Sequence, residues 1–335
     1  MKLAPMLSSL ALAVAAPAIS HAATFDPDSL ADVFVVTDGG TVQWFEATGA
    51  NNAVGYVKNI TSSATSVAAG NFDPDALSDL FVGKAASTSW YESTGADNGH
   101  GFVSNPLGGT LSNGLDMGEF DGDGQADLVR VADDGAVVQY EATASNNSIA
   151  YIRNLTSNGL AATFGDLDGD GFTDLFVTKD TTTTWYESDG TNNGITFRSN
   201  ISVTNAADVV VGDFDGDADN DLFVVLETGV IRWYESAGDN AAPAFVTDFD
   251  AGVSSIALGD IDGDNVNELL VGHASSGVSW YEAGAGNQVV LQSGATSFAT
   301  SGVLDIAILV PEPGSLALLS LGGLLVMCRK SRRTA

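Results

Sequence analysis

Short apolar runs recur along the chain, often alternating with polar residues, and turns rich in Gly, Asn and Asp separate them. One stretch shows the arrangement clearly, with such runs at residues 160–167, 174–178, 184–188 and 195–201. Runs of this length between turn residues predict short antiparallel β-strands. Away from the two ends of the chain, no segment has a convincing helical period. We therefore predict an all-β fold.

An acidic loop opens each copy of this four-strand pattern and recurs six times, at intervals of 47, 48, 47, 47 and 47 residues. A repeat of about this length with four short strands is typical of one blade of a β-propeller. The chain is therefore predicted to form one propeller domain at residues 23–310. We expect six four-stranded blades, with seven as the alternative.

The ends of the repeat array predict how the ring closes. The first copy begins at its acidic loop, so the first blade lacks a leading strand of its own. After the sixth copy, residues 288–293 supply that blade's last strand, and residues 296–301 resemble the leading strand at residues 65–69. A C-terminal strand that completes the first blade would hide both free sheet edges. Residues 305–310 resemble a second strand and leave room for a rudimentary seventh blade.

A pair of aromatic residues followed by glutamate marks the third strand of most copies, as in Trp90-Tyr91-Glu92. All five tryptophans occupy this position, and Gln139 replaces the tryptophan in one copy. Because neighbouring blades cover both faces of a blade, both rings can be buried, so we expect them to pack between blades. The alternative is a ring of exposed aromatic residues that stack on sugars. We interpret the repeated glutamate as a hydrogen-bond acceptor at the strand end.

The chain is strongly acidic, with 43 Asp and Glu, 12 Lys and Arg, and a formal net charge of −31. Binding to phosphate backbones or anionic lipid depends on Lys and Arg, so nucleic acid is excluded as a partner. About half of the acidic residues lie in the repeated loops. Nearly every charged or aromatic feature repeats blade by blade, whereas an active site needs unlike groups brought together. We therefore predict no catalytic residues.

The acidic loops follow the pattern D-x-D-x-D-G-x-x-D, which the fourth copy matches completely. Oxygen ligands at positions one, three, five and nine suit a hard cation and favour calcium over magnesium, and three histidines and one cysteine argue against zinc. The alternative is a set of solvated acidic turns in which Asp forms Asx turns. The candidate ligands are, loop by loop, Asp26, Asp28 and Asp32; Asn71, Asp73, Asp75 and Asp79; Glu119, Asp121, Asp123 and Asp127; Asp166, Asp168, Asp170 and Asp174; Asp213, Asp215, Asp217 and Asp221; and Asp260, Asp262, Asp264 and Glu268.

The loops differ in how well they match the pattern. Position six is glycine only in the third and fourth loops, and Ala76, Ala218 and Asn265 replace it in the second, fifth and sixth. Asn tolerates a positive φ and Ala tolerates it poorly. The first two loops also have fewer carboxylates. We therefore expect calcium affinity to fall from the fourth loop towards the first.

Both termini look like targeting segments, and they are the only parts predicted to be helical. Residues 1–22 have Lys2, an apolar stretch and small residues before Ala22, which predicts a secretory signal peptide, with a short buried helix as the alternative. Residues 311–335 comprise Pro311-Glu312-Pro313, an apolar stretch that is short for a membrane span, and a basic end. The basic end predicts that the body of the protein lies outside the cytoplasm.

The tail resembles the PEP-CTERM sorting signal of Gram-negative bacteria in its Pro-Glu-Pro motif, its short apolar segment and its basic end. This resemblance implies export, transient membrane association through the tail, and removal of the tail by an exosortase-type enzyme. The expected location is the cell surface or the extracellular matrix of a Gram-negative bacterium.

The loops, with the Asp-Leu-Phe-Val strands that follow them, resemble FG-GAP or VCBS repeats, as found in integrin α subunits, over residues 24–310. The resemblance implies a propeller with calcium in the hairpin loops of one rim and a role in adhesion, carbohydrate binding or scaffolding. We expect an exported, surface-sorted module that binds extracellular polysaccharide or a matrix or surface protein. The alternatives are a polysaccharide-active enzyme and a structural matrix protein without a ligand.

Overall fold

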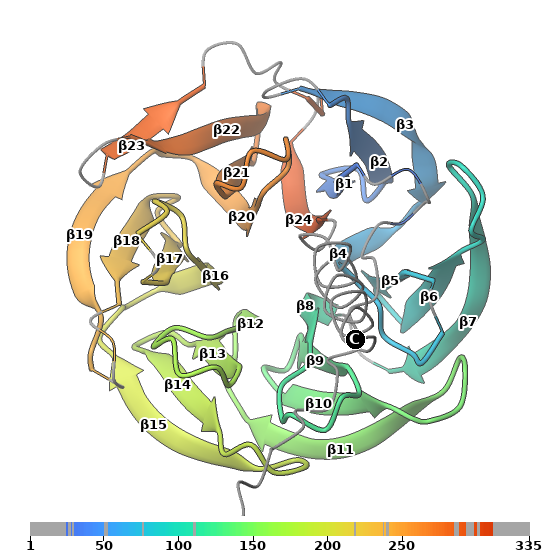
Figure 1. The fold of residues 1–335 in the computed structure, drawn as a ribbon, viewed down its shortest axis with the longest axis horizontal. Coiled ribbons are helices and arrows are strands. Elements are labelled where there is room, and N and C mark those ends of the chain that lie inside the picture. Colours follow the sequence, from blue (N-terminus) through green and yellow to red (C-terminus); the bar gives the residue numbers. More distant parts are fainter. Residues whose placement is uncertain are drawn as a thin grey trace, which may run out of the picture.

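The computed structural model describes residues 25, 28, 30–49, 53–75, 77–109, 112–217, 219–236, 238, 241–284, 288–292, 298–299 and 302–310. These residues form six antiparallel sheets of four strands, arranged as blades around a central axis (Figure 1). The all-β fold and the six-bladed propeller are therefore confirmed. The predicted signal peptide and sorting tail lie outside the described residues. Among the described residues, we found no helix with the length and apolar character needed to span a membrane.

Each blade runs from an inner strand at the axis to an outer strand at the perimeter. From inside to outside, the blades are β24 (Val303–Leu309), β1 (Asp32–Thr37), β2 (Val42–Ala47) and β3 (Val54–Thr61); β4 (Ala64–Gly70), β5 (Asp79–Lys84), β6 (Ser87–Ser93) and β7 (His100–Gly108); β8 (Ser112–Gly118), β9 (Asp127–Ala132), β10 (Val137–Ala142) and β11 (Ile149–Thr156); β12 (Ala162–Gly165), β13 (Asp174–Thr178), β14 (Thr183–Ser188) and β15 (Ile195–Ile201); β16 (Ala206–Gly212), β17 (Asp221–Leu226), β18 (Ile231–Glu235) and β19 (Ala244–Phe249); and β20 (Val253–Gly259), β21 (Glu268–His273), β22 (Gly277–Gly284) and β23 (Gln288–Leu291).

A C-terminal strand closes the ring, as predicted, but it is not the expected segment. β24 pairs with β1 from Asp32 opposite Leu309 to Thr37 opposite Val303. The segment expected to form a rudimentary seventh blade is thus the inner strand of the first blade, and the assignment of residues 296–301 to that place is wrong. Of those residues, Phe298 and Ala299 are described, and Phe298 forms an isolated bridge with Val278 of β22.

The reason lies in the side chains of β24, which are apolar on both faces. Val303 and Ile306 pack into the cluster between the sixth and first blades, whereas Leu309 packs between the first and second. An inner strand is covered by a blade on each side, so it needs apolar residues in both directions. Residues 303–309 meet this requirement, and the pairing removes the free edge of the first blade.

The aromatic residues of the third strands pack between blades, which confirms the packing prediction. Trp185 of the fourth blade shares a cluster with Tyr234 of the fifth, and Trp233 shares one with Tyr281 of the sixth. Each indole buries on the order of 200 Å², which corresponds to roughly 5 kcal/mol of transfer free energy before entropy is counted. The core is therefore a set of interfaces between neighbouring blades.

The inner strands β4, β8, β12, β16, β20 and β24 surround an axial cavity of about 130 Å³. Three aspartates line it, and they come from alternate blades: Asp116 on β8, Asp208 on β16 and Asp305 on β24. As the structure describes them, these six strands carry no basic residue. Nothing on the strands around the cavity therefore neutralises the three carboxylates.

Each axial carboxylate accepts a hydrogen bond from the backbone of the next blade. The donors are Phe164 N to Asp116 at 2.7 Å, Ile256 N to Asp208 at 2.9 Å, and Val67 N to Asp305 at 2.8 Å. The three aspartates thus join the inner strands of blades three and four, five and six, and one and two. Enclosure by the strands raises the pKa of Asp116 and of Asp208 to about 6, and it raises the pKa of Asp305 well above its ordinary value.

These aspartates should make stability depend on pH. The folded pKa of Asp116 is about 6, whereas its ordinary value is 3.8, so between these values the native state holds more protons than the unfolded chain. Its contribution to stability therefore falls as pH rises through this window. Asp116→Asn lacks this titrating group, so we expect its free energy of unfolding to rise relative to that of wild type between pH 4 and pH 7. Urea unfolding across this range measures the difference.

The exposed Asp133→Asn provides the matched control and should follow the wild-type pH profile. Parallel profiles for Asp116→Asn and wild type would contradict the role assigned to this carboxylate.

Candidate metal sites on one rim of the propeller

In the second to sixth blades the acidic loops connect the first and second strands, which places these five loops at the same end of the propeller, and the first loop directly precedes the second strand of its blade. Neighbouring loops also touch. Asn267 Nδ2 of the sixth loop donates to the carbonyl oxygen of Asp213 in the fifth at 2.6 Å, and Asn220 donates in the same way to Asp166 in the fourth. The loops of these three blades therefore form one continuous stretch of rim.

Carboxylates at positions one and five hold the third to sixth loops in shape. In the fourth loop, Asp166 accepts from Gly169 N at 2.8 Å and from Gly171 N at 2.9 Å, and Asp170 accepts from Phe172 N at 2.8 Å. The Asx turns considered as an alternative to metal binding are thus present. They do not exclude a metal, because each carboxylate oxygen has two acceptor sites.

Positive φ angles occur at two positions of the loop. At position six, Gly124 and Gly171 have φ of 83° and 88°, and Asn265 adopts 71°, as expected for Asn. Position four, which we overlooked in the sequence, has φ between 73° and 83° in the third to sixth loops, at Gly122, Gly169, Gly216 and Gly263. The first two loops have Pro27 and Pro74 there, and proline fixes φ near −65°. They cannot adopt the backbone that the other four share.

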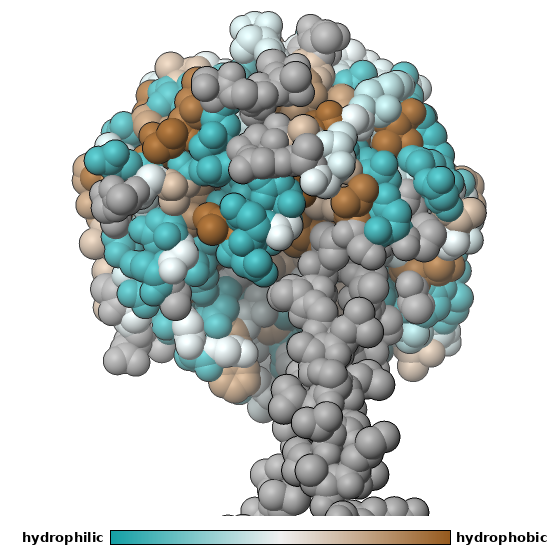
Figure 2. Space-filling model, turned by 45° about the horizontal axis from the view of Figure 1, so that its top comes forward, coloured by the Kyte–Doolittle hydropathy of each residue, from teal (hydrophilic) through white to brown (hydrophobic). Residues whose placement is uncertain are grey.

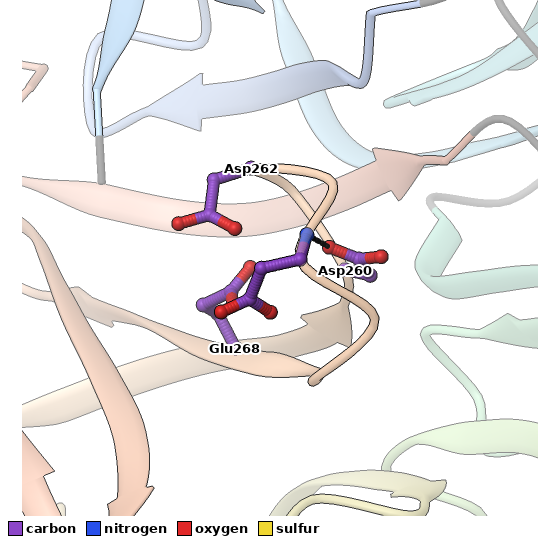
Figure 3. Close-up of side chains that lie close together, drawn as sticks. Asp260, Asp262 and Glu268 are labelled. Carbon is purple, nitrogen blue, oxygen red and sulfur yellow. Dashed lines mark hydrogen bonds between the residues drawn. The ribbon is translucent and has the colours of Figure 1, made fainter. Parts of the chain in front are cut away.

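The sixth loop gathers its carboxylates most completely. One oxygen each from Asp260, Asp262, Asp264 and Glu268 lies within 4.8 Å of the others. Calcium holds oxygen ligands at about 2.4 Å, so two ligands in one shell lie at most about 4.8 Å apart. Figure 3 shows the side chains of Asp260, Asp262 and Glu268 around this loop. Glu268 is fully buried and its Oε1 has no hydrogen-bond partner, so this oxygen fits the role of a metal ligand.

The third and fourth loops bring together the ligands of positions one, three and nine by the same criterion: Glu119, Asp121 and Asp127, and Asp166, Asp168 and Asp174. The Oδ2 atom of Asp168 is buried without a hydrogen-bond partner. Burial and the neighbouring Asp170 raise the pKa of Asp168, and similar causes raise the pKa of Asp215 in the fifth loop. A bound cation would offset the repulsion between these carboxylates and so stabilise their ionised form.

The repeated glutamate of the third strand lies close to the loop carboxylates, which we did not predict from the sequence. Glu92 lies with Asp73 and Asp75, and Glu141 lies with Asp121 and Asp123, again with one oxygen of each within 4.8 Å of the others. Burial, followed by repulsion from these aspartates, raises the pKa of Glu92, and burial and nearby aspartates also raise that of Glu141. The recurrence of a glutamate after the aromatic pair was the sequence signal that could have pointed to this cluster.

The carboxylate at position nine has a structural role that we did not predict. Asp221 Oδ2 accepts from Phe214 N at 2.8 Å, and its Oδ1 accepts from Trp233 Nε1 at 2.6 Å. Where glutamine replaces tryptophan, Gln139 Nε2 donates to Asp127 at 2.8 Å instead. This anchor is repeated by Asp32 and Asp79.

Burial is the main cause of the raised pKa values at position nine. They reach about 8 for Asp79 and Glu268, and about 7 for Asp127, Asp174 and Asp221.

The first two loops differ from the rest. Asp28 accepts from Leu30 N at 2.9 Å, and the predicted ligand Asp26 lies outside the described residues. In the second loop, Asn71 Nδ2 donates to the carbonyl oxygen of Asp75 at 3.1 Å. The lower calcium affinity expected of these two loops stays a prediction, which follows from their fewer carboxylates and from Pro27 and Pro74 at position four.

A second contact between blades was also missed. In the turn between β10 and β11, Asn147 N donates to Asp73 Oδ2 at 2.5 Å and Asn146 Nδ2 donates to Asp75 Oδ2 at 2.9 Å. Both acceptors belong to the preceding blade. Asn193 of the fourth blade contacts Asp121 of the third in the same way. The Asn-Asn turns of these blades are therefore part of the rim.

Position nine and position five should respond differently to mutation. Asp221→Ala leaves the Trp233 indole and the Phe214 amide unpaired, and each buried orphan donor costs about 1–3 kcal/mol. We expect a large loss of stability even in chelator. Asp217→Ala removes an exposed carboxylate that accepts from Asp219 N, and should cost under about 0.5 kcal/mol in chelator. Chemical denaturation in chelator measures both, and equal losses would contradict the distinction.

Comparisons with known proteins agree with this geometry. The FG-GAP-like repeat family matches residues 119–177, 166–224 and 213–271, which cover the third to sixth loops. A PEP-CTERM protein-sorting motif matches residues 309–333. A search among curated proteins found no significant match.

Solved structures share the fold at low sequence identity. A "putative 6-phosphogluconolactonase" from Bacteroides uniformis superposes with a TM-score of 0.56 at 9% identity, covering 84% of this chain and 99% of its own. One from Bacteroides fragilis gives 0.55 at 10% identity, covering 84% and 98%. A periplasmic gluconolactonase from Pseudomonas aeruginosa gives 0.50 at 14% identity, covering 78% and 82%. At these identities the likeness concerns the fold alone. The chain is thus a six-bladed β-propeller that contains FG-GAP-like repeats over residues 119–271 and carries a PEP-CTERM protein-sorting motif at residues 309–333.

Proposed function

We propose that the protein is a calcium-binding module that attaches to extracellular polysaccharide. The single observation that carries the proposal is the repeated convergence of carboxylates at the loops of one rim, most completely around Glu268. Cations bound at several loops would hold the rim in a fixed shape. A rim of fixed shape presents repeated sites at set positions, which favours binding of a ligand that itself repeats.

Calcium is the proposed cation because the donors are all oxygens and include several carboxylates in one flexible loop. The third to sixth loops would hold it through their carboxylates at positions one, three and nine, with position five as a further ligand. In the third blade, Glu141 would add a ligand from the third strand. When bound, the ion would neutralise the clustered carboxylates and tie each loop to the blade that carries it.

The sorting motif marks the protein as exported and implies processing by an exosortase-type enzyme. We propose that its destination is the cell surface or the extracellular matrix, where a chain with a net charge of −31 would meet calcium at higher concentration than inside the cell. Matrix polysaccharide and surface proteins are the available partners there. The repeated architecture favours polysaccharide, because a polymer presents the same group many times.

A binding role is favoured over an enzymatic one. The clustered carboxylates recur from blade to blade, whereas catalysis needs unlike groups at one place. The three similar structures described above carry gluconolactonase or 6-phosphogluconolactonase names, but they share only 9–14% of their residues with this chain. Turnover of a polysaccharide by the purified protein would favour the enzymatic alternative.

Calcium should bind mainly at the four loops that have glycine at position four. Saturating calcium at 100 times its dissociation constant would add about 2.7 kcal/mol of stability per site. We expect chelation to lower the melting temperature by many degrees. Asp168→Ala should remove one calcium per chain, whereas Asp26→Ala should leave the calcium content unchanged. Calorimetric titration and elemental analysis measure this, and equal melting temperatures in calcium and chelator would overturn the metal assignment.

Polysaccharide binding should depend on calcium. A glycan array probed with purified protein in calcium and in chelator tests the proposal directly. We expect binding to at least one polysaccharide class in calcium and its loss in chelator. If the protein binds no glycan under either condition, the polysaccharide assignment is wrong and a structural matrix role remains.

A further inference from the structure

Five aromatic rings lie exposed on the outer strands, one on each of the first five blades. They are Tyr56, Phe102, Tyr151, Phe197 and Phe245, and 55–60% of each residue is exposed. We call these five residues the aromatic belt. Each belt residue pairs with the inner aromatic residue of its blade, as Phe102 does with Tyr91. Figure 1 shows that their strands β3, β7, β11, β15 and β19 form the perimeter of the propeller.

A β-bulge gives each belt ring a polar companion. In the first blade, Phe45 opposes Tyr56 and Trp44 opposes Lys58, so Val57 is an extra residue. The bulge shifts the alternation by one, so the side chain three residues after the ring, Asn59, also faces outward. The same shift occurs in the next four blades. The exposed companions are Asn59, Asn105, Asn154, Asn200 and Asp248.

Packing alone does not require this arrangement. The belt rings do cover inner rings edge to face, as Tyr151 covers Tyr140 at 6.0 Å between centroids. In the sixth blade, however, Leu291 is paired opposite Tyr281, and the pairing of β22 with β23 runs without a bulge. The place opposite the inner ring can thus be taken by an aliphatic residue without a bulge. The ring and the outward amide therefore need another explanation.

At the first blade the belt opens into a pocket of about 620 Å³. Tyr56 forms part of its wall, together with Glu46, Thr48 and Lys58 of the same blade and Asn98 of the second. An aromatic face beside carboxylate, hydroxyl, amine and amide groups is the chemistry that binds a sugar, because the ring stacks on its C–H face and the polar groups pair with its hydroxyls.

Charge limits what can occupy the belt. Arg232 lies over Phe245 at 5.5 Å but is held by Asp248 through two hydrogen bonds of 2.8 and 2.9 Å. Arg198, beside Phe197, lies 3.7 Å from Glu187. These cations are matched by carboxylates, and the chain as a whole carries −31. The belt therefore fits an uncharged ligand better than an acidic polysaccharide or an anionic membrane.

On the face seen in Figure 2, hydrophobic residues form separate patches among hydrophilic ones. Separate apolar spots flanked by polar groups suit a polyhydroxylated chain better than an apolar protein surface.

We propose that the aromatic belt is a row of saccharide subsites that binds a neutral polysaccharide along the perimeter of the propeller, with the pocket beside Tyr56 as one of these subsites. This inference rests on the proposed polysaccharide function and assigns it to the outer strands, away from the acidic rim. Each ring with its polar companion is a weak subsite. Several subsites on one rigid scaffold raise the affinity for a polymer through effective concentration.

The test measures binding of soluble neutral polysaccharides, namely dextran, laminarin and xyloglucan, by affinity electrophoresis and calorimetry in saturating calcium, with alginate as the acidic comparison. We expect wild type to bind at least one neutral polymer more tightly than alginate. Tyr56→Ala should weaken that binding about tenfold. Replacement of all five belt residues by Leu should weaken it about a hundredfold or more.

Leucine is the replacement because the sixth blade already carries it opposite its inner ring, so folding should be retained, which melting temperature and calcium stoichiometry verify. Leu291→Ala is the matched control and should bind as wild type does. Leu291→Tyr should leave binding unchanged or strengthen it, since it adds a ring without the bulge.

The outcomes separate the belt from the proposed function. If wild type binds a neutral polymer and the five-leucine variant binds it equally, the belt assignment is overturned while the polysaccharide function stands. If wild type binds none of the polymers, both fail. If wild type self-associates in light scattering and the five-leucine variant is monomeric without any change in glycan binding, the belt is an interface between copies of this chain and the proposal is overturned.

Discussion

The carboxylate at the start of the second strand is the interaction on which the rest of a blade depends. It accepts from the loop backbone in all six blades, and it also accepts from the third-strand Trp or Gln in the first, second, third and fifth. In the fifth blade, Asp221 binds both the backbone at the base of the loop and the indole of Trp233. One buried side chain therefore fixes the acidic loop, the Trp233 indole and the register between the second and third strands. Two buried donors would lose their partner without it, which is far costlier than loss of a surface contact. The rest of the loop can vary because this anchor persists.

Contacts between blades then join these units into a ring. An indole from one blade and a phenol from the next share a cluster, as Trp185 and Tyr234 do, and the axial aspartates tie inner strands in pairs. No blade buries its faces alone, so each depends on its neighbours and on closure by β24. The axial carboxylates make that closure sensitive to protonation, because they have no cation beside them on the inner strands.

The repeat also divides the surface into two regions with different chemistry. The rim gathers carboxylates in loops that suit cations, whereas the perimeter presents separate rings, four of them beside an amide and the fifth beside Asp248. Both are copied around the ring, so a weak site becomes a row of sites at fixed positions. The variation between blades follows the same division. Pro27 and Pro74 set the first two loops apart at the rim, and Leu291 sets the sixth blade apart at the perimeter.

The period of the pattern, the turn residues and the loop spacing determined the propeller, the number of blades and the candidate ligands, because each depends on residues close together in the chain. Contacts between distant residues could not be predicted in this way. The pairing of Asp73 with Asn147 spans 74 residues, and the choice of closing strand depends on which segment is apolar on both faces once the ring has formed. Likewise, only the bulge in strand pairing decides that Tyr56 and Asn59 face outward together, since alternation alone would place them on opposite sides.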